Sequence, residues 1–305
     1  MVGNVTEMAR LDPTTPRSQS ERTPGERWRA ALEQWRIPPE ILAGAATSPW
    51  TLPVKMFAGR ARRQLEAPSG LSYEMALEAL PPGGSVLDVG AGAGAASLAL
   101  RSVAGAITAV DESEAMLATF SDLASTASVP AHTMLANTVL GTWPAVAANV
   151  ADADVVLCHH VVYNVADLVP FVTALTEHAR YRVVVELTAR HPAALLNPLW
   201  SALHGIDRPT GPRAADAIDV IASTGVDPRW QVWRRPITQD GTDYGELVAS
   251  ACRRLCLGPE RMSDVEAALR DQGVRPDRPY LGDAMRELVT IWWEPSSPGT
   301  TDAQR

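Results

Sequence analysis

The stretch VLDVGAGAG, residues 86–94, decides the fold of this 305-residue chain. Before the first glycine it is apolar apart from one aspartate, which suits a strand buried on both faces. The three glycines can adopt positive φ and let a ligand approach the backbone closely. The small residues beyond them predict a helix over 93–103, whose free N–H groups would point at that ligand. The pattern predicts a binding turn at the end of a buried strand.

Acidic residues accompany this turn at two places. Asp88 lies two positions before the first glycine, and Asp111 ends the next apolar run, GAITAVD. At the carboxyl end of a strand, the Asp111 carboxylate can accept hydrogen bonds from both hydroxyls of a ribose. The spacing Gly90-x-Gly92-x-x-Ala95 also matches the dinucleotide fingerprint, so a nicotinamide enzyme is an alternative.

The charge of Asp88 separates these two cofactors. A carboxylate this close to the turn would repel the diphosphate of a dinucleotide. It would attract, directly or through water, the ammonium and sulfonium groups of S-adenosylmethionine. The acidic residues therefore favour S-adenosylmethionine as the ligand, and a sheet with a vestigial site is the further alternative.

With these residues in place, the chain resembles the class I S-adenosylmethionine-dependent methyltransferases. Their first motif, an acidic residue, any residue and then Gly-x-Gly-x-Gly, is filled by Asp88, Gly90, Gly92 and Gly94. Asp111 matches the acidic residue that ends their second strand. The resemblance covers roughly residues 75–190 and implies that S-adenosylmethionine is the cofactor.

The resemblance also implies a set of cofactor-binding residues near the ends of the first four strands. They are Asp88, Val89, Gly90, Ala91, Gly92, Gly94, Asp111, Glu112, Met116, Ala136, Asn137 and His159. Asn137 follows the predicted third strand, where the family places a residue that binds the adenine amino group, although it can equally cap a turn. Met116 is a candidate to pack on the adenine ring or in the core. The backbone at His159 is expected to contact the methionine half of the cofactor.

Apolar runs and helical patterns alternate through the middle of the chain. Strands are predicted at 85–89, 106–110, 131–135, 154–159, 182–187, 229–235 and 286–294, and helices at 93–103, 113–125 and 166–178. This order predicts an α/β fold, a doubly wound sheet with parallel strands and right-handed crossovers. The resemblance implies a Rossmann-like, seven-stranded, mostly parallel sheet of order 3-2-1-4-5-7-6 whose last strand is antiparallel.

Composition and periodicity divide the chain into segments. Residues 1–24 are rich in Thr, Ser, Pro and Arg and are predicted to be a disordered tail. Residues 25–80 are interpreted as an N-terminal helical cap. Residues 81–295 are the expected S-adenosylmethionine-binding domain, with a helical insert at about 243–272 before the last strand. Residues 296–305 are predicted to be a flexible tail.

Charge and composition narrow the function classes. A net charge of −8 and a pI near 5.3 argue against general nucleic-acid binding. No uncharged apolar run reaches membrane-spanning length and no secretory signal core is visible, so no membrane contact and a cytoplasmic location are expected. Cys252 and Cys256 lack a matching Cys or His pair nearby, so no metal site is predicted.

Three side chains near the carboxyl edge of the predicted sheet are candidates for catalysis, namely His160, Tyr163 and Glu186. His160 can take a proton from an acceptor hydroxyl or amine, and it or Tyr163 can face the acceptor. Adjacent strand residues point to opposite faces, so His159 and His160 are not expected to act together. In the structural alternatives, one histidine caps the strand while the other packs, and Glu186 pairs with an arginine.

Together these features predict a methyltransferase that acts on O, N or C of a small molecule. The Asn-Pro-Pro-aromatic and Pro-Cys motifs of nucleic-acid base methyltransferases are absent from the sequence. Two alternatives stay open at this point. One is a methyltransferase for a protein or RNA partner, and the other is a non-catalytic S-adenosylmethionine-binding protein. Either the enzyme or the binding protein could form a homodimer through its helical additions.

Overall fold

A computed structural model describes residues 22–51, 53–126, 134–237 and 243–295. Seven strands form one sheet, and they are β1 (Ser85–Val89), β2 (Ala106–Asp111), β3 (Leu135–Leu140), β4 (Ala153–His159), β5 (Ala179–Thr188), β6 (Arg229–Pro236) and β7 (Met285–Trp293). Their order is β3-β2-β1-β4-β5-β7-β6. The first five strands are parallel, and β7 runs antiparallel to β5 and β6. The predicted doubly wound α/β fold and strand order are confirmed.

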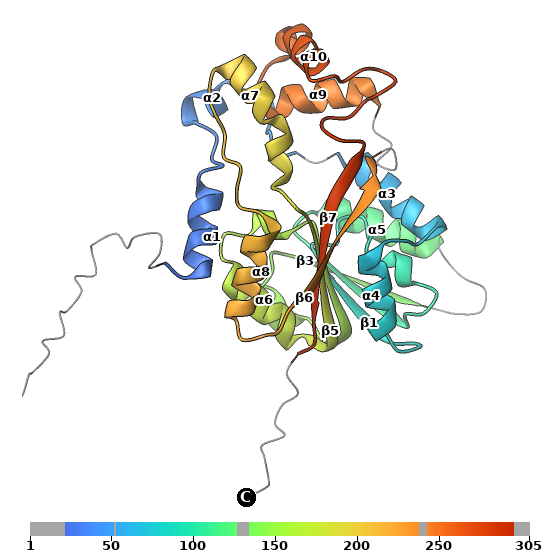
Figure 1. The fold of residues 1–305 in the computed structure, drawn as a ribbon. Helices are drawn as coiled ribbons and strands as arrows, with labels where there is room; N and C mark the ends of the chain where they lie inside the picture. Colours follow the sequence, from blue (N-terminus) through green and yellow to red (C-terminus); the bar gives the residue numbers. More distant parts are fainter. Residues whose placement is uncertain (1–21, 52, 127–133, 238–242, 296–305) are drawn as a thin grey trace, which may run out of the picture.

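Helices cover both faces of this sheet (Figure 1). One face carries α1 (Pro24–Glu33), α6 (Leu168–Glu177) and α8 (Ala214–Ser223). The other carries α3 (Val54–Glu66), α4 (Leu71–Ala79) and α5 (Glu114–Thr126). Each face buries its own cluster of apolar side chains, as expected for a parallel sheet that is covered on both sides. The predicted helices at 113–125 and 166–178 correspond to α5 and α6.

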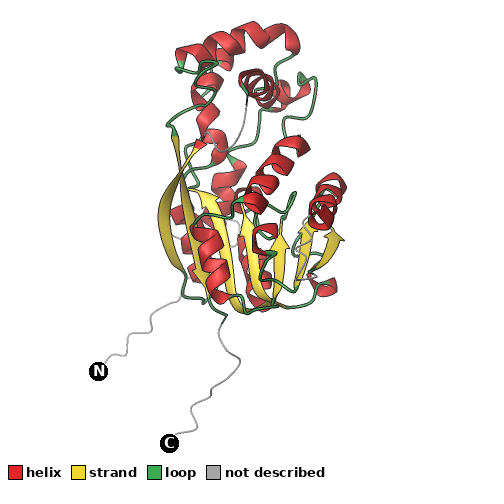
Figure 2. Ribbon diagram, turned by 90° about the vertical axis from the view of Figure 1, so that its right-hand side faces the viewer, coloured by secondary structure: helices red, strands yellow, loops and turns green. Residues whose placement is uncertain are grey.

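A third layer of helices lies above the carboxyl edge of the sheet, at the top of Figures 1 and 2. It consists of α2 (Pro39–Ala43), α7 (Asn197–His204), α9 (Tyr244–Arg254) and α10 (Met262–Asp271). Their apolar side chains form a separate cluster around Leu199, Leu255 and Leu269, each fully buried. We call these four helices the upper cap. It includes the predicted helical insert at about 243–272.

The segment 25–80 does not gather into a single cap as predicted. Helix α1 packs on α6 and α8, α2 joins the upper cap, and α3 and α4 cover the opposite face of the sheet. Helix α1 begins at a capping box between Thr23 and Glu26. Its Trp28 is buried and donates a hydrogen bond to the carbonyl of Val165 (2.8 Å). These helices therefore pack in different places, each against its own apolar partner.

The predicted third strand at 131–135 is wrong in position. Strand β3 spans Leu135–Leu140, and residues 131–133 lie outside the described residues. β3 is an edge strand, and nearly all of its side chains are exposed. An edge strand that buries little has no strong apolar pattern, so the sequence gives a weak signal for its position.

The predicted helix over 93–103 is also wrong. The chain there forms turns, and its only regular element is the three-residue 3₁₀ helix η1 (Leu98–Leu100). Ser97 and the three residues of η1 are all buried. Because the centre of the segment is buried, tertiary packing replaces the amphipathic helix that local propensity favours. Elsewhere in the described residues, 3₁₀ segments occur at η2 (Ala147–Asn149), η3 (Val162–Asn164), η4 (Pro192–Leu196) and η6 (Pro259–Arg261).

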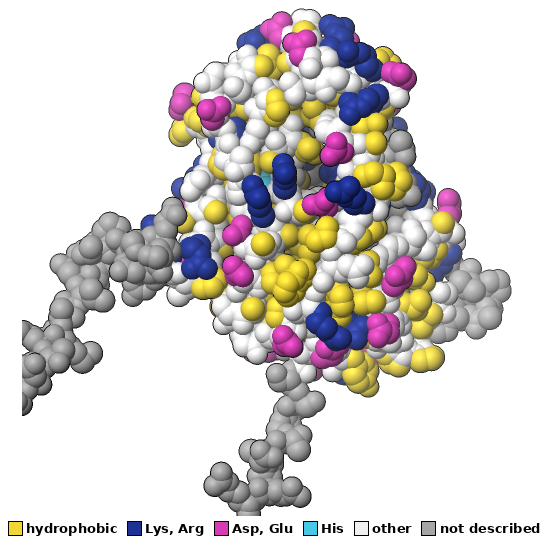
Figure 3. Space-filling model, viewed as in Figure 1, with side chains coloured by type: hydrophobic (Ala, Val, Ile, Leu, Met, Phe, Trp, Pro, Cys, Tyr) yellow, Lys and Arg dark blue, Asp and Glu magenta, His cyan; other side chains and the backbone are white. Residues whose placement is uncertain are grey.

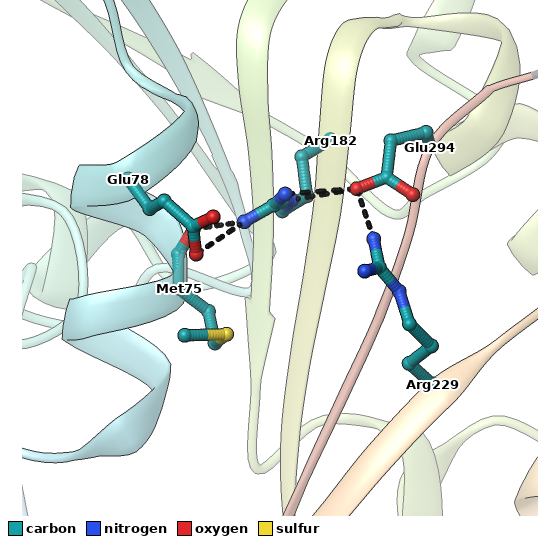
Figure 4. A network of polar contacts seen from close by, with 5 residues as sticks. All are labelled: Met75, Glu78, Arg182, Arg229 and Glu294. Carbon is teal, nitrogen blue, oxygen red and sulfur yellow. Dashed lines mark hydrogen bonds and ion pairs between the residues drawn. The ribbon is translucent and has the colours of Figure 1, made fainter.

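An arginine network ties the sheet to α4 (Figure 4). Arg182 on β5 is only 8% exposed, and its guanidinium donates to the Met75 carbonyl (3.0 Å), to Glu78 (3.2 Å) and to Glu294 (2.8 Å). Glu294 also pairs with Arg229, and these contacts hold the pKa of Glu294 below its usual range. The network therefore links α4, β5, β6 and the end of β7.

The two predicted tails lie mainly outside the described residues. Residues 1–21 and 296–305 are not described, so the predicted tails at 1–24 and 296–305 stay predictions apart from the start of α1 at Pro24. Within the described ranges, every helix is too short or too polar to cross a membrane.

Candidate functional site

The glycine-rich loop follows β1 at the point where the sheet order reverses between β1 and β4. Gly90, Gly92 and Gly94 have φ values of 72°, 54° and 86°, which lie in the left-handed region that glycine adopts freely. A Cβ at Gly90 would lie 2.2 Å from the side chain of Val161. The loop therefore needs glycine both for its backbone conformation and for its close packing.

Asp111 joins this loop to the end of β2. Its Oδ2 accepts a hydrogen bond from the Gly92 N–H (2.8 Å), and its Oδ1 accepts one from the Ser113 N–H (2.9 Å). Each carboxylate oxygen can accept a second bond, and the side chain is part-exposed. The neighbouring Glu112 is exposed, whereas Met116 is 4% exposed on α5. Asp111 thus keeps acceptor capacity at the ligand side of the loop.

Asp88 lies in a different environment from the one predicted. It is 1% exposed, and its Oδ2 accepts a hydrogen bond from the Ser97 hydroxyl (2.6 Å). Burial raises the pKa of this carboxyl to about 6, and the hydrogen bond from Ser97 opposes part of that rise. A direct contact between Asp88 and a ligand is not supported. Its effect on the loop is an electrostatic one, exerted from within the protein.

Ala136 and Asn137 do not lie at the carboxyl edge of the sheet, so this prediction is corrected. They pair in register with Ile107 and Thr108, within β2 and β3. Leu140, not Asn137, is the residue opposite Asp111. At about 3.3 Å per residue, Asn137 lies roughly 10 Å short of that edge. The error follows directly from the misplaced third strand.

A histidine and a glutamate meet where β4 and β5 end. The Nε2 of His160 lies 3.1 Å from Oε1 of Glu186. His160 has φ 61°, so the chain leaves the strand conformation there and the imidazole turns toward Glu186. Strand alternation no longer applies at such a residue, and both His159 and His160 interact electrostatically with Glu186. Both histidines therefore lie near Glu186, and that they do not act together stays a prediction.

Glu186 is a buried, ionised carboxylate. It is 8% exposed, and its Oε2 also accepts a hydrogen bond from the Ser72 hydroxyl of α4. Burial acts to raise its pKa, but hydrogen bonds and charge from the two histidines and Ser72 outweigh burial and lower it to about 2. Ser72 in turn contacts the hydroxyl of Thr290 (2.8 Å), which accepts a hydrogen bond from Trp233 Nε1 (2.9 Å). The partner of Glu186 is thus histidine, and not the arginine of the structural alternative.

Tyr163 does not join this pair. It is 6% exposed in η3, and its hydroxyl donates to the Thr188 carbonyl (2.9 Å). Its ring stacks on Trp28, with centroids 5.7 Å apart, and burial raises the pKa of its phenol. Because the hydroxyl is bonded and enclosed, the predicted catalytic role of Tyr163 is not supported. It is a core residue that positions α1.

Sequence reasoning missed three residues that shape this region. Ser72 contacts both Glu186 and Thr290, although it lies 114 positions from Glu186 and 218 positions from Thr290 along the chain. Phe57 of α3 covers the loop, since a Cβ at Gly92 would meet its ring at 3.4 Å. No local pattern in the sequence could have placed such distant residues together.

Comparisons with known proteins bear on this geometry. A family model described as "Methyltransferase domain" matches residues 87–181, from β1 into β5. Over residues 87–181 the chain is therefore similar to a methyltransferase domain. The methyltransferase domain thus contains both the glycine-rich loop and the two histidines, while Glu186 lies just beyond the matched segment. A comparison of the sequence with curated proteins finds no match.

Solved structures with a similar course of the chain include three methyltransferases. A putative methyltransferase from Bacillus halodurans C-125 is 12% identical, with 74% of this chain and 97% of that chain covered and a TM-score of 0.49. A putative sarcosine dimethylglycine methyltransferase from Galdieria sulphuraria is 14% identical, with coverage of 77% and 86% and a TM-score of 0.48. An S-adenosylmethionine-dependent methyltransferase from Thiobacillus denitrificans, in complex with S-adenosyl-L-homocysteine, is 16% identical, with coverage of 79% and 98% and a TM-score of 0.47.

The cofactor that a methyltransferase domain indicates is S-adenosylmethionine, and the residues around the loop fit it. The glycines leave the loop backbone open to close approach, and Asp111 has lone pairs to spare for ribose hydroxyls. His159, at the end of β4, has a buried Nε2 with no hydrogen-bond partner among the described residues. Burial lowers its pKa to about 4, so this imidazole is neutral. A buried unpaired nitrogen of this kind favours a ligand that supplies its missing bond.

Proposed function

We propose that this methyltransferase acts on a small molecule. The observation that carries the proposal is the upper cap, which is built from α2, α7, α9 and α10 and lies above the carboxyl edge of the sheet (Figures 1 and 2). Ligands of doubly wound sheets bind at that edge, at the point where the strand order reverses. Because the upper cap lies over this edge, the site favours a small acceptor that it can enclose over an extended macromolecule.

The surface around this edge supports the same proposal. On the face shown in Figure 3, a few Lys or Arg side chains lie below the upper cap among acidic and apolar ones. The chain as a whole has a net charge of −8. Nucleic-acid binding draws on a broad basic surface, so an RNA acceptor is disfavoured.

Each residue of the site has its own role in binding the cofactor. Asp111 accepts hydrogen bonds from the ribose of S-adenosylmethionine, and the loop from Gly90 to Gly94 supports its methionine half. His159 supplies a neutral polar nitrogen, and Phe57 excludes water from the loop. The cofactor supplies an activated methyl group on a sulfonium. Alignment of the acceptor with that group is worth up to roughly 7–11 kcal/mol of the barrier.

The test is turnover with the full chain and S-adenosylmethionine labelled in its methyl group. Pools of small metabolites, peptides and RNA are offered separately, and the label is followed into each. We expect incorporation into a small molecule, with none into peptide or RNA. Label in peptide or RNA alone would overturn the proposed acceptor class. Binding of S-adenosylmethionine without transfer to any pool would favour a non-catalytic binding protein instead.

A further inference from the structure

The arrangement of His160 and Glu186 carries an inference about the acceptor. We propose that His160 is the general base of the reaction, that Glu186 positions it, and that the acceptor atom is a hydroxyl oxygen. This inference rests on the proposed function, because it concerns the acceptor of the same site. It names the class of substrate and the direction of the proton, neither of which follows from the methyltransferase domain itself.

The first step of the argument is the tautomer of His160. Glu186 is buried and ionised, so both of its oxygens are acceptors only. The 3.1 Å contact therefore requires that Nε2 of His160 carry the proton that it donates to Oε1 of Glu186. In a neutral imidazole, Nδ1 then holds the lone pair. Glu186 thereby fixes which nitrogen can act as a base.

The second step is the accessibility of that nitrogen. The side chain of His160 is 39% exposed, whereas that of Glu186 is 11% exposed. The hydrogen bonds of the described residues include none to Nδ1 of His160, and the residue as a whole is exposed. Nδ1 can therefore reach an acceptor that lies at the carboxyl edge of the sheet. His159 cannot replace it, because its Nε2 is buried and its imidazole has no carboxylate in hydrogen-bond contact.

The third step is the backbone at His160. Its φ of 61° is uncommon for a residue other than glycine and costs free energy. The peptide N–H of His160 donates to the carbonyl of Glu186 (2.7 Å), so the same two residues are held together by backbone and side chain. A strained residue that is fixed in this way keeps its imidazole in one orientation, as a positioned base requires.

The chemistry then favours a hydroxyl acceptor. A neutral hydroxyl is a weak nucleophile until its proton is removed, whereas a neutral amine already has a free lone pair. In the reaction, the acceptor oxygen forms a bond to the methyl carbon while the bond from that carbon to sulfur breaks, and its electron pair stays on sulfur. The hydroxyl proton moves to Nδ1 of His160. Glu186 stabilises the resulting imidazolium, which then releases the proton to solvent.

The variants that test this proposal keep the fold. His160→Asn suits the left-handed backbone, since asparagine adopts positive φ more readily than most residues, and it removes the base. We expect kcat to fall by roughly 10²–10⁴-fold, while KM and affinity for S-adenosylmethionine stay within twofold. Glu186→Gln should also lower kcat, but by a smaller factor than His160→Asn. Exogenous imidazole should restore part of the activity of His160→Gly, which relieves the backbone strain.

Two measurements distinguish a catalytic base from a residue with only a structural role. The rate of the wild-type protein should fall at acid pH, and His160→Asn should lose that acidic limb. The titratable groups that interact with His160 are Glu186 on β5 and His159 on β4, so both belong in the interpretation of the profile. In ¹⁵N spectra of the full chain with S-adenosylhomocysteine, His160 should be protonated at Nε2 in the wild type, and Glu186→Gln should disturb this preference.

Product analysis separates this inference from the proposed function. Labelled S-adenosylmethionine is offered with alcohols and phenols, with amines, and with carbon acids, as three sets of small molecules. Methyl transfer to oxygen, with a loss of rate in His160→Asn, is the expected result. Transfer to nitrogen or carbon, transfer with His160→Asn at the wild-type rate, or a His160 that is protonated only at Nδ1 would overturn the inference while the proposed function stands. Failure to bind S-adenosylmethionine at all would overturn both.

Discussion

At the scale of single residues, the site depends on groups whose surroundings set their protonation. Asp88 and Glu186 are both buried carboxyls on the same side of the sheet, yet their pKa values move in opposite directions, to about 6 and about 2. Asp88 has hydrogen bonds only from the hydroxyl and backbone of Ser97 and no cationic partner among the described residues, so burial dominates. Glu186 has Ser72 and His160, so its charged form is stabilised. The histidine partners of Glu186, not the depth of burial, separate the two pKa values.

The raised pKa of Asp88 predicts an unusual dependence of stability on pH. The native state holds this proton more tightly than the unfolded chain, whose aspartate titrates near 3.8. The stabilisation is fully present below pH 3.8 and is lost as the pH rises through about 6, at about 1.4 kcal/mol per pH unit between them. Asp88→Asn lacks this dependence and still offers an acceptor to Ser97. In urea unfolding at pH 4 to 8, Asp88→Asn should gain stability relative to the wild type between pH 4 and 6. A constant difference across that range would contradict the assignment.

The glycines of the loop allow a matched comparison. Gly90 and Gly83 have nearly the same φ, 72° and 75°, but a Cβ meets Val161 at Gly90 and nothing within 4 Å at Gly83. Gly83→Ala should cost only backbone strain, about 1–2 kcal/mol, and leave cofactor affinity unchanged. Gly90→Ala adds an overpacking cost of about 1–3 kcal/mol and should also weaken S-adenosylhomocysteine binding. Thermal melts and calorimetry on both variants give the comparison, and equal losses would mean that Val161 can move aside.

At the scale of elements, packing decides what the sequence pattern leaves open. The strands that are buried on both faces follow their predicted positions within a few residues, because continuous apolar runs mark them clearly. Strand β3 and the segment around η1 do not, because one is exposed and the centre of the other is buried. The misplaced strand alone accounts for the wrong assignment of Asn137. The contacts of Ser72 with Glu186 and Thr290 could not be predicted, because these residues come from distant parts of the chain.

The arginine network predicts how strongly α4 is attached to the sheet. Arg182 and Arg180 lie two residues apart on β5, but Arg182 is enclosed and bonded to several acceptors. Arg180 is 55% exposed and lies 3.5 Å from Asp154. Arg182→Met should lower the free energy of unfolding by about 2–3 kcal/mol. Arg180→Met should change it by less than about 1 kcal/mol. Urea titrations of both variants measure this difference, and similar losses for both would contradict a stabilising role for the network in Figure 4.

At the scale of the whole molecule, the fold gathers the site at one edge. The glycine-rich loop, Asp111 and the two histidines come from the ends of β1, β2 and β4, and parallel strands bring these ends to the same side of the sheet. The upper cap then packs over that edge around its own apolar cluster. This arrangement of strand ends suits the binding of a charged nucleoside cofactor, and we propose that the choice of acceptor depends on the cap.

Calorimetry on the full chain tests the central claim most directly. S-adenosylmethionine, S-adenosylhomocysteine and NAD are titrated into the wild type and into Asp111→Ala, with Asp122→Ala, an exposed acid on α5, as the control for charge. We predict that both sulfur nucleosides bind, that NAD does not, and that only Asp111→Ala weakens binding, by roughly 10–100-fold from one or two lost charged hydrogen bonds. Binding of NAD without binding of S-adenosylmethionine would contradict the account.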